Sequence, residues 1–153
     1  MSFFLKAKKK GYDQDQMITT NPIRGRIANT NVADSIFDGI TYNKGAATMK
    51  QICFLMSEES FGKGLSSYFK KYEWNNATID DFLAEMQKFF FQKEFTLPDW
   101  KHLWLESASL NVLEPEWNIN STDQHSKLLI KQSAYTYTFP TLRFHKIKVS
   151  FFR

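Results

Sequence analysis

Apolar residues recur every three or four positions in four stretches between Lys44 and Trp104, a spacing that predicts four amphipathic helices. Ser57, Thr78 and Thr96 directly precede three of these stretches and are good N-caps. Acidic residues fill the first turns that follow these caps, where the positive end of a helix dipole favours them. The expected helices cover residues 44–56, 58–72, 79–90 and 97–104.

Outside this region the pattern changes. Residues 1–31 contain Lys8-Lys9-Lys10-Gly11 and Asn21-Pro22, which are typical of chain breakers, so we expect an irregular segment there, followed by a short helix over 32–37. Residues 128–139 and 142–152 are rich in β-branched and aromatic side chains and are separated by Pro140, which predicts two strands. The expected fold is mainly α with a short C-terminal β pair.

The stretch from Phe37 to Ala47 combines unlike residues for no evident packing reason. Gly39 permits a turn, Asn43 is a suitable cap, and Gly45 opens a helix whose first turn has almost no side-chain bulk. Tyr42 precedes this thin helix start, so its phenol is a candidate hydrogen-bond donor in a cleft. The alternative is an ordinary packing tyrosine whose hydroxyl binds the backbone.

Several short motifs share one family resemblance. They are Thr20-Asn21-Pro22-Ile23, Ile36-Phe37-Asp38-Gly39-Ile40-Thr41-Tyr42-Asn43-Lys44-Gly45-Ala46, Phe61-Gly62-Lys63-Gly64-Leu65, Tyr68-Phe69, Trp74-Asn75-Asn76-Ala77-Thr78 and Trp104-Leu105-Glu106. Their order and spacing resemble the zinc aminopeptidases of the aminopeptidase N (gluzincin) family from about Gly11 to Phe152. The resemblance implies the helical half of a gluzincin catalytic domain over residues 1–117 and the truncated start of a β-sandwich domain over 118–153. It also implies that Tyr42 donates a hydrogen bond to the oxyanion of the tetrahedral intermediate.

The zinc ligands of that family are not present in this sequence. The family binds zinc through H-E-x-x-H on a helix and a later Glu, whereas His102, His125 and His145 are too scattered to form this motif. Asn21 also stands where the family often has a histidine. We therefore expect a C-terminal catalytic-domain fragment that is inactive alone and holds no metal or other cofactor, with zinc present only in the complete enzyme.

The resemblance also implies partners: the missing N-terminal part or another protein chain, and a peptide substrate in the complete enzyme. A different hypothesis is a catalytically silent structural or interaction subunit derived from an aminopeptidase.

Three acidic residues near the start of the third expected helix resemble paired catalytic carboxylates: Asp80, Asp81 and Glu85. We interpret them as solvated acids at a helix start.

The amino-acid composition limits the classes of protein to which this chain can belong. The 153 residues are 42% hydrophobic and 16% aromatic, which excludes a disordered tail. The aromatic content fits either a piece that packs against further protein or a simple aromatic core. One cysteine, Cys53, excludes an intrachain disulfide and is interpreted as a small hydrophobe. No apolar run approaches the length of a membrane span, and we expect an intracellular, cytoplasmic protein.

The net charge of +4 raises the question of nucleic acid. Residues 124–153 contain no acid. Basic residues are interleaved with aromatic residues there, which would suit a phosphate-binding strand surface; they are Lys127, Lys131, Arg143, Lys146, Lys148 and Arg153. No nucleic-acid-binding motif accompanies them, and basic residues commonly guard a solvated strand edge. Nucleic-acid binding is therefore disfavoured.

Overall fold

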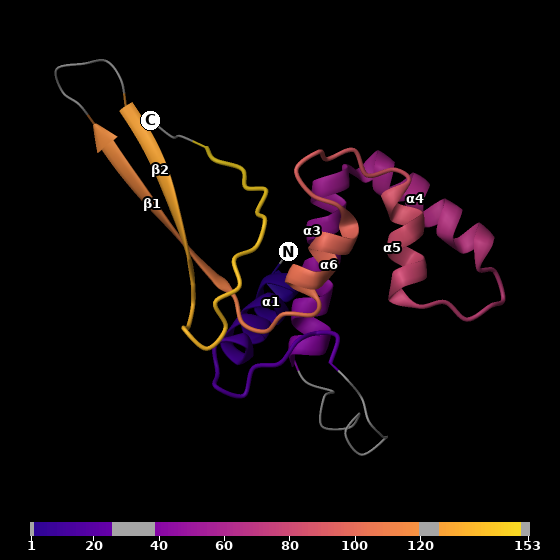
Figure 1. Ribbon diagram of the computed structural model, residues 1–153, viewed down its shortest axis with the longest axis horizontal. Helices are drawn as coiled ribbons and strands as arrows, with labels where there is room; N and C mark the ends of the chain where they lie inside the picture. The colour runs from indigo at the N-terminus through magenta and orange to yellow at the C-terminus, as the bar shows by residue number, and fades with distance from the viewer. Residues whose placement is uncertain (1, 26–38, 120–125, 151–153) are drawn as a thin grey trace.

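A computed structural model describes residues 2–25, 39–119 and 126–150 (Figure 1). In chain order, its elements are α1 (Ser2–Asp15), η1 (Ile40–Lys44), α3 (Gly45–Met56), α4 (Glu58–Lys71), α5 (Ile79–Gln87), α6 (Leu97–Trp104), β1 (Asn111–Ile119) and β2 (Ser126–Ala134). The mainly α fold with a C-terminal β pair is confirmed. The hairpin and helices α4 and α5 lie at opposite ends of the molecule, with α1 and α3 between them (Figure 1).

The helix starts follow the capping signals in the sequence. Thr78 accepts a hydrogen bond from the Asp81 backbone N–H while the Asp81 carboxylate accepts one from the Thr78 N–H, which is a complete capping box. Thr96 and Asp99 form the same arrangement at α6. Ser57 caps α4 by accepting from the Ser60 N–H. These local contacts confirm the three expected helices that follow Ser57, Thr78 and Thr96.

One hydrophobic core joins α3, α5 and α6. Its buried members are Ile52, Leu55, Met56, Leu83, Met86, Phe90, Leu97, Trp100 and Leu105. Trp100 is fully buried and donates its indole N–H to Gln51 Oε1 at 3.0 Å. Helix α4 covers this core, and Gly64 packs directly against Met86. The core therefore holds α3, which continues from η1, on a rigid support.

The expected irregular N-terminus is wrong for residues 2–15, which form α1. The lysines and Ala7 in this stretch are good helix formers. Gly11 is buried within the helix rather than ending it, because α1 lies against η1 there. A Cβ at Gly11 would lie 3.0 Å from the Lys44 backbone nitrogen and 3.1 Å from Asn43 Cβ. The glycine thus permits a close helix approach.

The strand bounds also differ from the expectation. β1 and β2 pair antiparallel, with Asn111 opposite Ala134 and Pro115 opposite Ile130. β2 overlaps the first expected strand, whereas the described residues of the second, 142–150, have no regular structure. β1 was not expected. It contains Pro115, which is poor in strand interiors but is tolerated at the open edge of a two-stranded ribbon. Side-chain hydrogen bonds instead hold residues 142–150, as described below.

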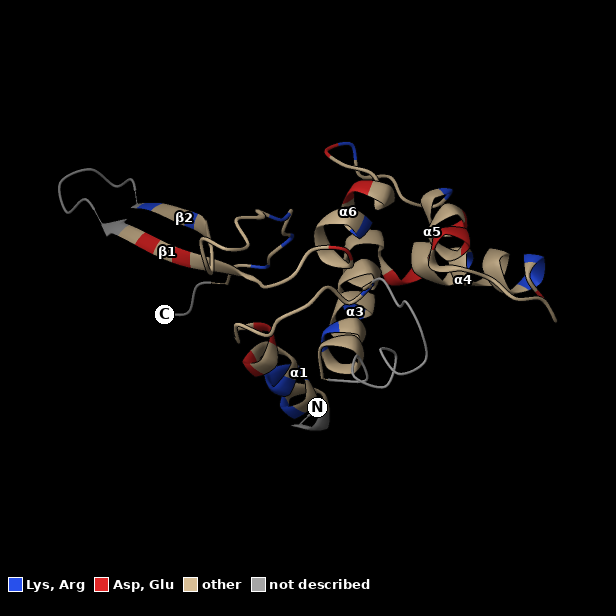
Figure 2. Cartoon of the chain, turned by 60° about the horizontal axis from the view of Figure 1, so that its bottom comes forward, with Lys and Arg blue, Asp and Glu red and all other residues tan. Residues whose placement is uncertain are grey.

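The hairpin carries charges of both signs, with acidic residues on β1 and basic residues on β2 (Figure 2). Lys131 pairs with Glu116 across the two strands. The expected short helix over 32–37 and His125 lie outside the described residues. The domain division at residue 117 stays a prediction.

Candidate functional site

Tyr42 lies in the middle of η1, a single π turn that runs directly into α3. Ile40 and Lys44 at either end of the turn are 1% and 6% exposed, whereas Tyr42 is 61% exposed. Isolated π turns are uncommon and occur frequently at functional sites. The turn is therefore anchored on one side and presents the tyrosine on the other.

Two local expectations about this turn need correction. Asn43 is not a helix cap, because helical geometry already begins at Ile40. Gly39 has an ordinary φ of −69°, so the turn itself does not require glycine. A Cβ at Gly39 would instead meet the end of the Gln14 side chain of α1, which would have to move. Gly39 thus permits a second close contact between α1 and the Tyr42 turn.

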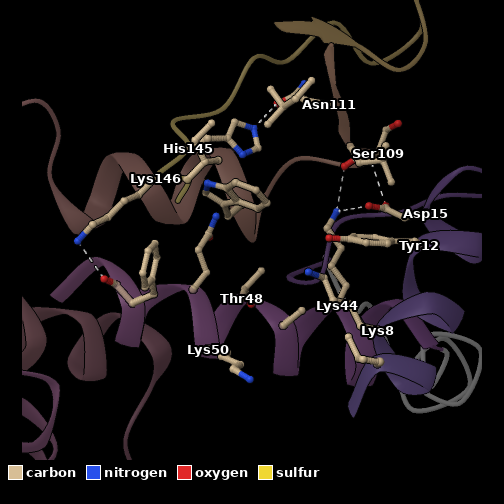
Figure 3. Close-up of a pocket in the computed structure, with 18 of the residues that line it drawn as sticks. Lys8, Tyr12, Asp15, Lys44, Thr48, Lys50, Ser109, Asn111, His145 and Lys146 are labelled. Carbon is tan, nitrogen blue, oxygen red and sulfur yellow. Dashed lines mark hydrogen bonds and ion pairs between the residues drawn. The ribbon is translucent and has the colours of Figure 1, made fainter. Parts of the chain in front are cut away.

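Lys44, the last residue of the turn, forms a buried ion pair with Asp15 (Figure 3). The Lys44 ammonium is 2.8 Å from Asp15 Oδ2 and donates to the Ser109 carbonyl at 3.1 Å. Asp15, which is 1% exposed, also accepts from the Ser109 N–H at 3.1 Å and from the Thr20 hydroxyl at 2.7 Å. The pair therefore connects α1, η1 and the segment that follows α6.

Burial and the neighbouring carboxylate have opposite effects on the pKa of Lys44. Burial lowers the pKa of Lys44, and the Asp15 carboxylate opposes that effect without cancelling it. Ser109, which contacts both charges, has a positive φ of 65°. Non-glycine residues hold this conformation only when the surrounding contacts impose it. The contacts around the ion pair thus hold Ser109 in a strained backbone conformation.

Arg143 provides a second buried cation near the pair. Its Nε donates to the Leu103 carbonyl at 2.7 Å, and its Nη2 donates to the Ala108 and Ser107 carbonyls at 2.8 and 3.2 Å. Burial lowers the pKa of Arg143. The sequence placed Arg143 on a basic strand surface, which is wrong, because it is 3% exposed and anchors the C-terminal segment against the end of α6.

A pocket of about 750 Å³ lies beside the ion pair, between α1, α3 and the C-terminal segment (Figure 3). Its walls are mostly apolar, and Lys44, Asp15, Ser109 and His145 are among its polar lining groups. Burial lowers the pKa of His145, whose Nε2 lies 3.3 Å from Asn111 Oδ1. Tyr42 is not part of the lining, whereas Lys44 at the end of the same turn is.

Of the three carboxylates considered in the sequence, Glu85 is not solvated. It is 1% exposed and accepts hydrogen bonds from Ser67 at 2.8 Å, Lys71 at 2.8 Å and Lys88 at 2.5 Å. The Lys71 hydrogen bond, with smaller contributions from Lys88 and Ser67, lowers the pKa of Glu85 to about 2. Such a carboxylate stays ionised and joins α4 to α5, which is a structural role.

Comparison with known proteins places this site in a family. Residues 1–97 match the peptidase family M1 domain. The chain belongs to peptidase family M1. Aminopeptidase N of Streptomyces lividans is 34% identical over 153 residues, which cover 97% of this chain and 18% of that protein.

Two further M1-type relatives match shorter stretches. Aminopeptidase M1-D of Oryza sativa subsp. japonica is 34% identical over 56% of this chain and 10% of its own length. Leucyl aminopeptidase of Saccharolobus solfataricus is 33% identical over 52% of this chain and 10% of its own length. The chain thus corresponds to a small part of these M1 aminopeptidases. The part matched by the family domain includes Tyr42, Lys44 and Asp15 but ends before Ser109.

M1 aminopeptidases are zinc enzymes, so we tested whether this part of the chain fits a zinc ion. Among the described residues, no three His, Cys, Asp or Glu side chains lie close enough to hold one. His102 is exposed and its Nδ1 lies 3.5 Å from Glu106 Oε2, while Cys53 is half-buried. The described residues therefore do not fit the metal. None of the helices in the described ranges is long and apolar enough to cross a membrane.

Proposed function

We propose that this chain is the tyrosine-bearing segment of an M1 aminopeptidase that removes N-terminal amino acids from peptides once it is joined to the part that binds zinc. Within it, Tyr42 donates its phenolic hydrogen bond to the oxyanion of the tetrahedral intermediate. By itself the segment has no activity. The division into a helical catalytic part, 1–117, and the start of a β-rich domain, 118–153, belongs to the same proposal.

The observation that carries this proposal is the placement of Tyr42. Its side chain is exposed on a turn whose two ends, Ile40 and Lys44, are buried. A phenolic hydroxyl can donate a hydrogen bond. An oxyanion-stabilising donor must be held in place before the reaction, because then no reorganisation is needed as charge develops. The anchored turn meets that requirement.

A chimeric enzyme tests the proposal. Residues 1–153 replace the corresponding segment of Streptomyces lividans aminopeptidase N, and kcat and KM are measured with a peptide substrate. Tyr42→Phe should lower kcat about 100- to 1000-fold while KM changes little, which is typical for loss of one oxyanion donor. Tyr72→Phe is the matched control, since its hydroxyl donates to Asp81 in the α4–α5 region and kcat should be unchanged.

Two results would contradict the proposal. One is an unchanged kcat for Tyr42→Phe. The other is a chimera that binds zinc and melts cooperatively but has no activity with Tyr42 present. Native mass spectrometry of the endogenous species complements this test, because a zinc-free assembly would favour the silent structural subunit instead.

A further inference from the structure

The π geometry of η1 is visible in the backbone hydrogen bond at the end of the turn. The Gly45 backbone N–H donates to the Ile40 carbonyl, five residues back, which is the defining π-type bond, and it also contacts the Tyr42 carbonyl. A π turn holds one residue more than an α turn. Its relaxation to α geometry would rotate the preceding residues by about 100° around the axis of α3. Tyr42 would then point in a different direction, so something must hold the turn.

The contacts that hold it converge on Lys44, the last residue of η1. Lys44 binds Asp15 and the Ser109 carbonyl, and those two groups bind each other through the Ser109 N–H. Thr20 completes the set by donating to Asp15. Both direct partners of Lys44 come from outside η1 and α3, so its position is fixed relative to α1 and to the segment that follows α6 (Figure 3).

The cost of this arrangement argues against a purely stabilising role. Buried ion pairs are commonly no more stable than well-packed apolar residues of similar size, because both charges lose their hydration. Ser109 is held in a strained conformation as well. Directional contacts, on the other hand, fix the angle and register of a backbone more strictly than apolar contacts do. We propose that Lys44 and Asp15 are positioning residues that hold η1 as a π turn and thereby aim Tyr42; the functional consequence rests on the proposed role of Tyr42.

The first test uses the 153-residue chain without any activity. The Asp15→Asn/Lys44→Met variant removes both charges with little change in volume. We expect its denaturation midpoint to stay close to that of the unmodified chain, while hydrogen exchange of the Gly45 amide accelerates at least tenfold and the NMR signals of the Tyr42 ring shift. The matched control is Asp13→Asn/Lys9→Met, which makes the same substitutions in an exposed pair of α1 and should change neither signal.

An unchanged Gly45 exchange rate and Tyr42 spectrum in the Asp15/Lys44 variant would overturn the proposal, as would equal changes in the control. If that variant does not fold, Lys44→Arg provides the test, because it keeps the charge but changes the length and shape of the donor. Lys44→Arg should shift the Tyr42 signals, and Lys9→Arg should not. An unshifted Tyr42 spectrum in Lys44→Arg would equally overturn the proposal.

A second test in the chimeric enzyme separates this inference from the proposed function. Lys44→Arg should lower kcat at least tenfold with little change in KM when Tyr42 is present, and it should have no further effect in the Tyr42→Phe background. Equal effects in both backgrounds would show that Lys44 does not act through Tyr42. If Tyr42→Phe itself leaves kcat unchanged, the proposed function fails, while the NMR test of positioning remains decisive.

Discussion

Gly64 in α4 provides a direct test of how the helical core is packed. A Cβ built on Gly64 would lie 2.5 Å from Met86 Sδ and 3.5 Å from Met86 Cα. Met86 is 0% exposed and lies in α5, where it belongs to the hydrophobic core. Gly64→Ala should therefore force the two helices apart or distort Met86.

Two effects of opposite sign determine the result. Replacing glycine by alanine inside a helix stabilises by about 0.8–1 kcal/mol, whereas overpacking a buried contact costs about 1–3 kcal/mol. We expect Gly64→Ala to lower the free energy of unfolding by about 1 kcal/mol. Gly62→Ala is a matched control in the same helix, because no atom lies within 4 Å of its added Cβ. It should raise the free energy of unfolding by about 1 kcal/mol.

The assay is urea denaturation followed by circular dichroism, with the m-value checked for constancy. The difference between the two variants, about 2 kcal/mol, is well above the error of such measurements. In a Met86→Ala background the clash is absent, so Gly64→Ala should become stabilising. If Gly64→Ala stabilises the unmodified chain as much as Gly62→Ala does, the close contact between α4 and α5 is wrong.

Two further predictions concern buried polar groups. Ser109→Gly keeps both backbone contacts to the ion pair and relieves the strain of the positive φ. It also removes a buried hydroxyl that has no hydrogen-bond partner among the described residues. The substitution should therefore stabilise the chain by about 1 kcal/mol in thermal unfolding, and a loss of stability would contradict the assigned strain. Glu85 has a pKa lowered from 4.5 to about 2, so its ionised form stabilises the fold above pH 4.5 and that contribution is lost as the pH falls toward 2. The stability difference between the unmodified chain and Glu85→Gln should therefore shrink between pH 5 and pH 2 in urea titrations, and a constant difference would refute the assignment.

The helices that follow Ser57, Thr78 and Thr96 could be predicted because their signals are local. Thr78 and Asp81 are three residues apart, and so are Thr96 and Asp99, and each pair forms the capping box that this spacing favours. The apolar spacing behind each cap then specifies the buried face. No distant contact is needed to identify such helices.

Helix α1 and the hairpin could not be located in this way. Gly11 looks like a breaker in the sequence, and only its contact with Lys44 and Asn43 explains why a helix accepts it. Pro115 lies within β1, and its position on an open two-stranded ribbon allows it there. In both cases the residues that lie opposite in the folded chain decide the secondary structure. The spacing of apolar residues along the sequence carries no information about them.

In the candidate site, too, the local signal could be predicted from the sequence and the distant contacts could not. A contiguous motif singled out Tyr42, whereas its supporting residues come from distant positions and carry no shared spacing. A lysine between Asn43 and Gly45 could be a surface residue, and only the fold brings Asp15 and Ser109 to it. Glu85 was misjudged for the same reason, since Ser67, Lys71 and Lys88 enclose it.

The support of the Tyr42 turn extends beyond the helices that carry it. Asp15 lies in α1 and Lys44 in η1, but Ser109, which contacts both, follows α6 and precedes the hairpin. Arg143 of the C-terminal segment then holds that same stretch through the Ser107 and Ala108 carbonyls. Because a buried charge that loses a hydrogen-bond partner is costly, removal of the residues after α6 would weaken the ion pair and, with it, the turn. The C-terminal segment is therefore part of the structural support of Tyr42, although it lies outside the stretch that matches the M1 domain.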